Sequence, residues 1–267
     1  MRLSELRARL SCAGSEEATV EARYLFCHIT GCTPAALLGE DPDCTDPRLA
    51  EVLMRREARE PLAYILGEAP FYRSVLRVTP DCLIPRADTE RLVELAVARL
   101  PHGAHFCDLC TGSGAIAVTV LSERPDTTAV ATDLSEGALA VARENAARLG
   151  VADRLTLLQS DVLTECPEGP FGAILSNPPY IPTAVVATLT PEVKREPPTA
   201  LDGGEDGLLF YRRLLTLTPR LRKGGFLLLE CGYDQEVPMA HLTSEAGLGF
   251  EPYYDYGGRF RGCTVTP

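Results

Sequence analysis

The stretch Ser176-Asn177-Pro178-Pro179-Tyr180 carries groups that could bind a planar NH2 group. Two successive prolines lack N–H donors and hold the backbone before them extended, so the Pro178 carbonyl stays free to accept. A planar NH2 group has two hydrogens, and the side-chain oxygen of Asn177 and the Pro178 carbonyl can accept one each. The Tyr180 ring offers a flat wall for stacking. The motif therefore predicts a site that fixes an amide or amino nitrogen.

Two hydrogen-bond acceptors placed in this way would make the bound nitrogen a better nucleophile. An amide nitrogen is a poor nucleophile because its lone pair is delocalised, and two acceptors on its hydrogens favour the pyramidal, reactive form. Positioning and preorganised electrostatics then supply most of the catalysis. We assign catalysis to Asn177, Pro178 and Tyr180, and substrate binding to Asn177, Pro178, Pro179 and Tyr180. A proline-rich turn with no chemistry remains the alternative.

A second motif runs from Asp108 to Ala117 and contains Gly112 and Gly114. It follows an apolar run and opens a helical pattern, which is where glycines let the backbone approach a ligand. Asp133 follows the next apolar run, at about the 20-residue spacing at which an acid holds ribose hydroxyls. NAD and S-adenosylmethionine (SAM) both fit this pattern, and so do glycines that only permit tight packing. Asp161 is an adenine contact or a helix N-cap.

The hydrophobic pattern predicts which elements position these motifs. Residues 1 to 75 have helical periodicity and predict a small helical domain that docks the substrate. Residues 76 to 100 read as a linker with a short hairpin and a helix. Residues 101 to 267 alternate short apolar runs with helical stretches, which predicts parallel strands at Phe106–Leu109, Ala129–Thr132, Leu155–Leu158, Ala173–Ser176 and Phe226–Glu230. Two final β-rich runs, Phe250–Tyr256 and Arg261–Thr266, predict an antiparallel hairpin.

Composition narrows the class of protein and its partners. The chain has 267 residues, of which 45% are hydrophobic and 24% charged, as in an ordinary globular protein. No apolar run is long enough for a membrane helix, and the first residues are polar, so we expect a cytoplasmic protein without membrane contact. A net charge of −11 argues against binding nucleic acid through phosphates. We expect a monomer.

The ten cysteines are scattered through the chain and predict free thiols. His102, His105, Cys107 and Cys110 resemble zinc ligands in number and type. Residues 105 to 110 read as a strand, in which His105 and Cys107 share a face and Cys110 lies opposite. We therefore expect no metal site.

The combination of glycine loop, Asp133 and Asn-Pro-Pro-Tyr resembles class I SAM-dependent methyltransferases that act on nitrogen. Further segments resemble the PrmC/HemK family, which methylates the glutamine of the GGQ motif in peptide chain release factors. These segments are Glu60–Gly67, Leu83–Glu90, Glu196–Gly203 and Leu228–Gly232. The resemblance implies a Rossmann-like α/β fold, with a mostly parallel sheet and a C-terminal antiparallel hairpin, after a small N-terminal helical domain. It also implies SAM as cofactor and release factors as protein substrates.

Carried over to this chain, the resemblance assigns SAM binding to Cys110, Thr111, Gly112, Ser113, Gly114, Asp133, Asp161, Val162 and Asn177. We add Arg86 to the substrate-binding residues. Three positions depart from the family pattern: Cys110 replaces a glycine, Val162 an aromatic residue and Ala87 a proline. Cys110 is tolerable if its φ is negative, and Val162 offers less stacking area.

Three alternatives remain open from the residues. A DNA or RNA amino-methyltransferase acting on an exocyclic base NH2 would use a similar motif. An NAD-dependent oxidoreductase would explain the loop and Asp133 but leaves Asn177 to Tyr180 without a role. A binding protein that kept the fold would explain none of the catalytic groups.

Overall fold

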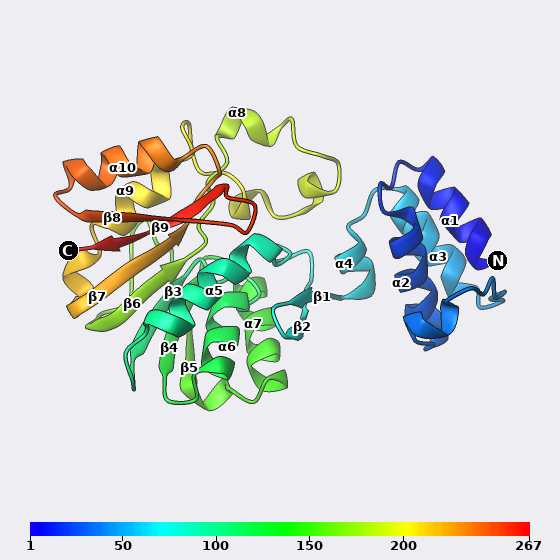
Figure 1. Ribbon diagram of the computed structural model, residues 1–267, viewed down its shortest axis with the longest axis horizontal. Helices are drawn as coiled ribbons and strands as arrows, with labels where there is room; N and C mark the ends of the chain where they lie inside the picture. The colour runs from blue at the N-terminus through cyan, green and yellow to red at the C-terminus, as the bar shows by residue number, and fades with distance from the viewer. The chain divides into compact units, whose positions relative to one another are not determined.

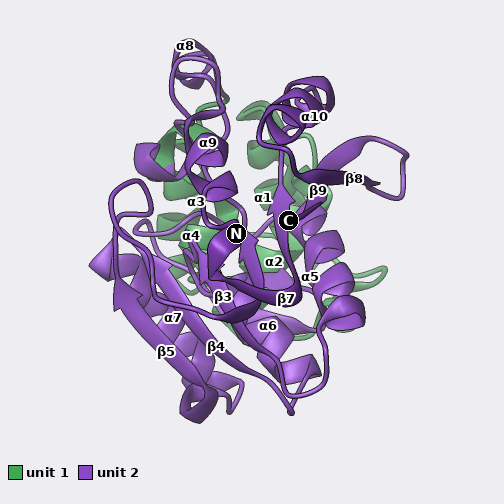
Figure 2. Cartoon of the chain, turned by 90° about the vertical axis from the view of Figure 1, so that its left-hand side faces the viewer, with its two compact units in different colours: residues 1–68, 190–195 green, residues 69–189, 196–267 purple.

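The computed structural model describes residues 1–267 and divides them into two compact units. Unit 1 contains Met1–Glu68 and the short segment Thr190–Arg195. Unit 2 contains Ala69–Leu189 and Glu196–Pro267 (Figure 2). The chain therefore leaves unit 1, builds most of unit 2, and returns to unit 1 for six residues before completing unit 2.

Unit 1 is helical, as the sequence predicts. Its helices are α1 (Leu3–Cys12), α2 (Ala18–Thr30), α3 (Arg48–Glu57) and α4 (Leu62–Leu66), with a 3-10 turn at Pro34–Leu37. Gly31 ends α2 in the left-handed conformation, with φ 71°, which glycine adopts without steric cost. Leu6, Leu10 and Leu25 are among the fully buried residues of its core.

An ion-pair network ties the returning segment to the helices of unit 1. Arg56 on α3 is 7% exposed. Its guanidinium pairs with Glu21 on α2 at 3.0 Å and with Glu192 at 2.9 Å. Arg59 also pairs with Glu192, at 2.7 Å. We call Arg56, Arg59, Glu21 and Glu192 the Arg56 network. Its carboxylates neutralise a charge that would be costly to bury alone.

A hairpin and a helix follow unit 1 along the chain. The hairpin consists of β1 (Glu68–Phe71) and β2 (Ser74–Arg77), and α5 spans Ala87–Arg99. The sequence predicts the hairpin after residue 75, whereas its strands already begin at Glu68. Helix α4 ends only two residues before the first strand of the hairpin. Composition alone therefore predicts the first residue of that strand poorly.

The centre of unit 2 is a seven-stranded sheet with the order β5-β4-β3-β6-β7-β9-β8 (Figure 1). Its parallel strands are β3 (His105–Leu109), β4 (Thr128–Asp133), β5 (Leu155–Gln159), β6 (Phe171–Ser176) and β7 (Leu221–Glu230). The hairpin strands β8 (Gly249–Tyr254) and β9 (Phe260–Thr266) are antiparallel, and β9 pairs with β7. All five predicted parallel strands and the C-terminal hairpin are confirmed.

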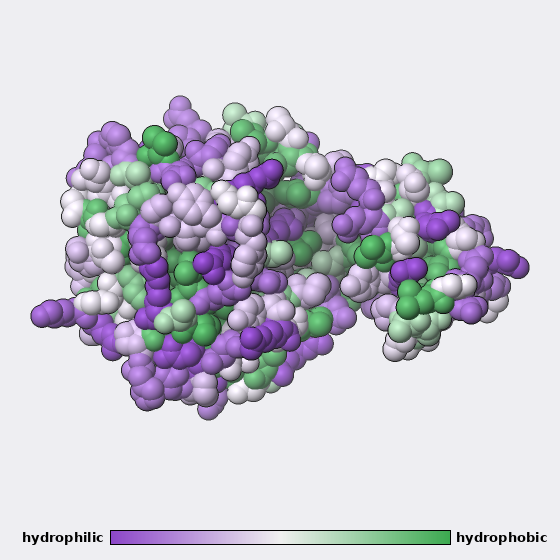
Figure 3. Space-filling view, in the orientation of Figure 1, coloured by the Kyte–Doolittle hydropathy of each residue, from purple (hydrophilic) through white to green (hydrophobic).

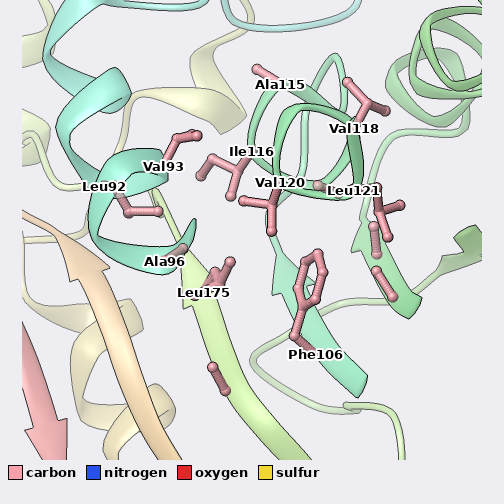
Figure 4. Close-up of a cluster of buried hydrophobic side chains, with 14 of the residues drawn as sticks. Leu92, Val93, Ala96, Phe106, Ala115, Ile116, Val118, Val120, Leu121 and Leu175 are labelled. Atoms are coloured by element: carbon pink, nitrogen blue, oxygen red, sulfur yellow. The ribbon is translucent and has the colours of Figure 1, made fainter. Parts of the chain in front are cut away.

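Helices cover both faces of the sheet, which gives unit 2 three layers. One buried cluster joins α5, α6 (Ala115–Glu123) and α7 (Glu136–Arg148) to one face. The other joins α9 (Leu209–Leu215) and α10 (Glu236–Glu245) to the opposite face. Figure 4 shows side chains of α5 and α6 gathered beside Phe106 of β3 and Leu175 of β6. The remaining helical pieces are α8 (Thr183–Val186) and 3-10 turns at Ala152–Arg154, Val193–Arg195, Pro198–Ala200 and Thr218–Arg220.

The surface mixes residue types. On the face shown in Figure 3, hydrophilic residues dominate unit 2 and hydrophobic residues are scattered among them. None of the helices combines the length and apolar character needed to cross a membrane. All ten cysteines carry free thiols.

Candidate active site

The polar residues picked out in the sequence lie at or just after the carboxyl ends of neighbouring strands. Leu109 of β3 lies beside Thr132 of β4 and Ser176 of β6, and Ser176 lies beside Leu229 of β7. The residues that come next therefore share one edge of the sheet. Between β3 and β6 the strand order reverses, and open α/β sheets bind ligands at such a point.

A cavity of about 440 Å³ lies at this edge, entirely within unit 2. Its volume suits a small-molecule ligand. Most of the predicted site residues line it, and they are Arg86, Cys110, Thr111, Gly112, Ser113, Asp133, Asp161, Val162, Asn177 and Pro179. Gly114, Pro178 and Tyr180 are not among the residues that line it. The fold thus brings the glycine loop and the proline motif to the same cavity.

Buried Asp108 holds the glycine loop through hydrogen bonds. Its Oδ2 accepts hydrogen bonds from Thr111 Oγ1 at 2.6 Å and from the backbone N–H of Ala117 at 3.2 Å. Burial raises the pKa of Asp108 to about 7, although these two hydrogen bonds act against the shift. Asp108 therefore ties the loop to the first turn of α6.

The two glycines of the loop have different roles. Gly112 has φ 56°, and a Cβ placed there would meet no protein atom within 4 Å, so its backbone faces open space. Gly114 has φ 80°, and a Cβ there would stand 3.0 Å from Ala142 Cβ on α7. Gly112 permits a ligand to approach the backbone, whereas Gly114 permits α6 and α7 to pack closely.

Cys110 has a φ of 61°, so the condition of a negative φ is not met. A non-glycine residue in the left-handed region costs roughly 1–2 kcal/mol because its Cβ crowds the carbonyl. The loop keeps the turn that a glycine would adopt freely and carries this strain beside the cavity.

Asp133 holds the loop and still has capacity to bind a ligand. Its Oδ2 accepts the N–H of Gly112 at 2.8 Å, and its Oδ1 accepts the N–H of Ser135 at 2.9 Å. Burial raises its pKa, against the effect of these backbone N–H groups. Each carboxylate oxygen has a second lone pair, so both can accept further hydroxyl groups.

Asp161 and Val162 lie on the loop after β5. Asp161 Oδ1 accepts the backbone N–H of Leu163 at 2.9 Å, in a turn rather than at the start of an α-helix. The N-cap alternative is therefore wrong, and the second oxygen remains available at the cavity. Val162 is only 5% exposed and packs into the α9 and α10 side of the core.

Asn177 is held by a residue of α5. Its Nδ2 donates to Thr89 Oγ1 at 3.2 Å, which leaves the Asn177 Oδ1 as the acceptor for a ligand. Pro178 and Pro179 are buried after β6, and neither has an N–H to donate. Asn177, the first acceptor that the motif predicts, therefore lines the cavity with its oxygen free, whereas Pro178 is buried and does not line it.

Tyr180 and Arg86 are both engaged by neighbouring residues. Tyr180 is half-buried against the α9 side of the core, its carbonyl accepts from Gln235 Nε2 at 3.1 Å, and burial raises its pKa. Arg86 Nη2 donates to Glu196 Oε1, and Glu196 is 2% exposed and also accepts the N–H of Ile84 at 3.0 Å. This pair joins the loop before α5 to the segment after Arg195 within unit 2.

Sequence reasoning missed three buried polar residues at the site: Thr89, Glu196 and Glu230. Glu230 is the last residue of β7, so the rule that ligands bind beyond the carboxyl ends of strands could have found it. Thr89 and Glu196 lie in segments that carry the family resemblance, Leu83–Glu90 and Glu196–Gly203, but the sequence pattern does not show which residues they meet. No group of three or more His, Cys, Asp or Glu side chains is placed to hold a metal ion.

Comparison with known proteins gives the family. The PrmC N-terminal domain model matches residues 3–67, and the methyltransferase small domain model matches residues 88–210. The release factor glutamine methyltransferase of Cereibacter sphaeroides is 48% identical over 90% of this chain and 87% of its own length. The chain belongs to the release factor glutamine methyltransferase family.

Further comparisons agree with this family and its fold. The family member from Moorella thermoacetica is 41% identical, over 97% of this chain and 95% of its own length. A methyltransferase structure from Pyrococcus furiosus matches with a TM-score of 0.54 and 19% identity, over 82% of this chain and 98% of that one. The fold is that of class I methyltransferases, and the family assignment makes this chain a methyltransferase.

Proposed function

We propose that this methyltransferase transfers a methyl group from SAM to the side-chain amide nitrogen of the glutamine in the GGQ motif of peptide chain release factors. The family supports this, since its members carry the name release factor glutamine methyltransferase. The observation that carries the proposal is Asn177, whose Nδ2 is held by Thr89 so that Oδ1 is left to accept from a substrate NH2 group.

The cavity residues fit SAM. The Asp133 carboxylate would accept the ribose hydroxyls, and the open backbone at Gly112 would let the ligand approach the loop. Asp161 and Val162 would flank the adenine, and the other predicted residues of the loop, Cys110 to Gly114, would surround the methionine part. Val162 would contact the adenine with an aliphatic rather than an aromatic surface.

The chain's own groups would orient and activate the substrate nitrogen. When bound, SAM supplies a methyl group on a sulfonium, and the carbon–sulfur bond breaks with its electron pair on sulfur. Asn177 Oδ1 and the Pro178 carbonyl would accept the two amide hydrogens and so weaken conjugation of the nitrogen lone pair. The nitrogen–carbon bond would form as the carbon–sulfur bond breaks, and the cationic N-methyl amide would then lose one of these hydrogens as a proton to solvent water. No strong base is required.

We assign the remaining predicted residues to the substrate glutamine. Tyr180 would stack against the planar amide, and Pro179, which lines the cavity, would limit its movement. Arg86, held by Glu196, would contact the release factor backbone near the glutamine. These roles rest on the positions of the residues at or beside the cavity.

We further propose that unit 1 binds the release factor away from the glutamine and that the enzyme acts as a monomer without binding nucleic acid directly. The net charge of −11 supports a protein partner over a polyanion. Val20 and Tyr24, one turn apart on α2, are 46% and 49% exposed. Replacing both by serine should raise the KM for release factor and leave SAM affinity unchanged.

The function is tested by methyl transfer from labelled SAM to three acceptors. These are purified release factor, the same factor with the GGQ glutamine replaced, and a mixture of DNA and RNA. We expect label only on the intact release factor. Equal labelling of the glutamine-free factor would refute the site of methylation, and labelling of nucleic acid alone would favour a base amino-methyltransferase.

A further inference from the structure

Glu230 is a buried carboxylate that has no role in the methyl-transfer reaction proposed above. It ends β7, is 2% exposed, and its Oε2 has no hydrogen-bond partner. Burial raises its pKa to about 7, with hydrogen bonds from Thr89 and Asn177 acting against the shift. A buried, incompletely satisfied charge at a ligand site calls for a physical explanation.

Thr89 links this carboxylate to the proline motif. Thr89 is 4% exposed on α5, and its Oγ1 accepts from Asn177 Nδ2. A hydroxyl has only one hydrogen to donate. Thr89 accepts from Asn177 through its oxygen, and its single hydrogen is left to be donated to Glu230. Glu230 thus accepts from both Thr89 and Asn177, and Thr89 accepts from Asn177, so the donor hydrogens of the three side chains all point toward the carboxylate.

The ionised carboxylate of Glu230 decides which groups donate and which accept in these hydrogen bonds. It accepts and never donates, whereas a hydroxyl or a carboxamide can do either. With Glu230 ionised, Thr89 donates to it and must accept from Asn177. The Asn177 carboxamide is then fixed with its NH2 group inward and its Oδ1 toward the cavity, where a substrate NH2 needs an acceptor.

We propose that Glu230, acting on Asn177 both directly and through Thr89, is a positioning residue for methyl transfer that holds the Asn177 carboxamide in its productive orientation. The inference rests on the proposed function, because the orientation matters only if Asn177 accepts from a substrate NH2 group. Rotating the carboxamide by half a turn would present NH2 to NH2, and the substrate nitrogen would lose one of its two acceptors.

The Glu230→Gln variant tests the direction of the hydrogen bonds separately from the shape of the side chain. Its side chain is nearly isosteric with glutamate, but its NH2 group can donate to Thr89 Oγ1. Thr89 would then donate to Asn177 Oδ1, and the carboxamide would turn its NH2 group to the cavity. A purely structural role of Glu230 predicts no such loss.

Protonation of Glu230 should have the same effect as the Glu230→Gln substitution, because a carboxylic acid can also donate a hydrogen bond.

The charged and titratable groups that face Glu230 are Asp88 on α5, Tyr180 after β6, Cys231 after β7, Tyr253 on β8 and Arg261 on β9. Burial raises the pKa of each tyrosine and of the Cys231 thiol, so these stay neutral near pH 7. Arg261 is shared between Asp88 and Asp255, both at 3.0 Å. Activity should therefore fall as the pH drops through about 7.

The experiment measures single-turnover methylation of release factor by the full chain, beside SAM affinity and thermal unfolding. The variants are Glu230→Gln, Thr89→Val and Thr89→Ser, with Thr119→Val as a control at a buried threonine of α6 whose hydroxyl has no partner. We expect Glu230→Gln and Thr89→Val to slow transfer by roughly tenfold or more, with SAM affinity within about threefold of the parent. Thr89→Ser and Thr119→Val should stay near the parent rate.

The pH profile supplies the second readout. The parent should lose activity on the acid side near pH 7, and Glu230→Gln should lack this limb. A Glu230→Gln variant with the parent rate and the parent acid limb would overturn the proposal. Equal rates for Thr89→Ser and Thr89→Val would overturn the role of Thr89.

A folding failure of one variant, or a different methyl acceptor, would each leave the role of Glu230 testable. If Glu230→Gln does not fold, the Thr89→Ser and Thr89→Val pair decides the outcome, since the two differ at the hydroxyl. If the parent labels a different NH2-bearing acceptor, the proposed function fails, and the same variants are then compared on that acceptor. The orientation of Asn177 is thereby tested independently of which molecule carries the amide.

Discussion

The two units bury charge in opposite ways. In unit 1, Arg56 is 7% exposed, and two carboxylates and a backbone carbonyl accept from its guanidinium. In unit 2, Glu230 is 2% exposed, and one of its carboxylate oxygens has no hydrogen-bond partner. Arg56 is thus satisfied by the fold, whereas Glu230 retains unused capacity.

The difference separates a structural role from a functional one. Removing a partner from a complete buried network is expensive because the other charge stays buried and unpaired. A buried carboxylate that lacks a partner costs stability from the outset, and beside a ligand cavity it is a candidate for a functional role. Substitutions in the Arg56 network should therefore change stability, and substitutions of the acidic and carboxamide side chains at the sheet edge should change binding or rate.

The largest effect should follow from Asn177→Ala. Loss of one preorganised contact that is strongest in the transition state should lower the methyl-transfer rate by roughly 10²–10³-fold, with little change in SAM affinity. Asn177→Asp keeps an acceptor of nearly the same shape and should retain more activity. Single-turnover rates beside calorimetric SAM binding measure both. A near-parent rate for Asn177→Ala would remove the basis for assigning function to the sheet edge.

Arg56→Met should have the next largest effect, on stability. It removes the charge shared by Glu21 and Glu192 and should lower the free energy of unfolding of unit 1 by about 3 kcal/mol, at the lower end for a buried ion pair because both carboxylates are partly exposed. Hydrogen exchange of α2 and α3 measures this. Unchanged protection there, or a loss of SAM affinity in unit 2, would break the proposed division of roles.

Asp133→Ala should weaken SAM binding by about 1.5–3 kcal/mol, the range for hydrogen bonds to a charged group. Part of this loss comes from the freed N–H of Gly112, which now bonds to Asp133 Oδ2. Calorimetry measures the change, with exposed Asp153→Ala as the control for loss of one negative charge. Equal SAM affinities for the two variants would exclude Asp133 from the cofactor site.

Cys110→Gly should give the smallest effect. Relief of the left-handed strain, roughly 1–2 kcal/mol, is partly offset by the greater chain entropy of glycine in the unfolded state. Unit 2 should gain about 0.5–1 kcal/mol of stability, seen as a higher melting temperature. A lower melting temperature would mean that packing of the Cys110 side chain outweighs the strain at φ 61°.

The sequence was most informative where covalent geometry restricts the chain. Prolines restrict the backbone after Asn177, and glycines permit a turn after Leu109 that other residues adopt only with strain. Both motifs follow strand ends, as does Asp133 at the end of β4, so strand order brings Gly112, Asp133 and Pro179 to the same cavity. Alternation of apolar runs likewise predicted all five parallel strands. These are local signals, and the fold preserves them.

Contacts between distant segments were not predictable in this way. Thr89 meets Asn177 across 88 positions of the chain, and Glu196 meets Arg86 across 110. The return of Thr190–Arg195 to unit 1 has no compositional sign either. Glu230 ends an apolar strand, and its burial depends on α5 and on the hairpin β8–β9. The pattern of apolar residues within the strand does not predict where these elements pack. The sign of φ at Cys110 depends on how the whole loop closes.

The discontinuity of unit 1 also has a consequence for biosynthesis. Arg56 and its partner Glu192 are 136 positions apart, so ribosomes adding about 5–20 residues per second need roughly 7–27 s to make the second after the first. During that interval Arg56 has only one of its two carboxylate partners, Glu21. Unit 1 therefore cannot reach its final stability before β6 and the Asn177 motif have been synthesised, and a nascent chain stalled before Glu192 should expose an unfinished, protease-sensitive amino-terminal unit.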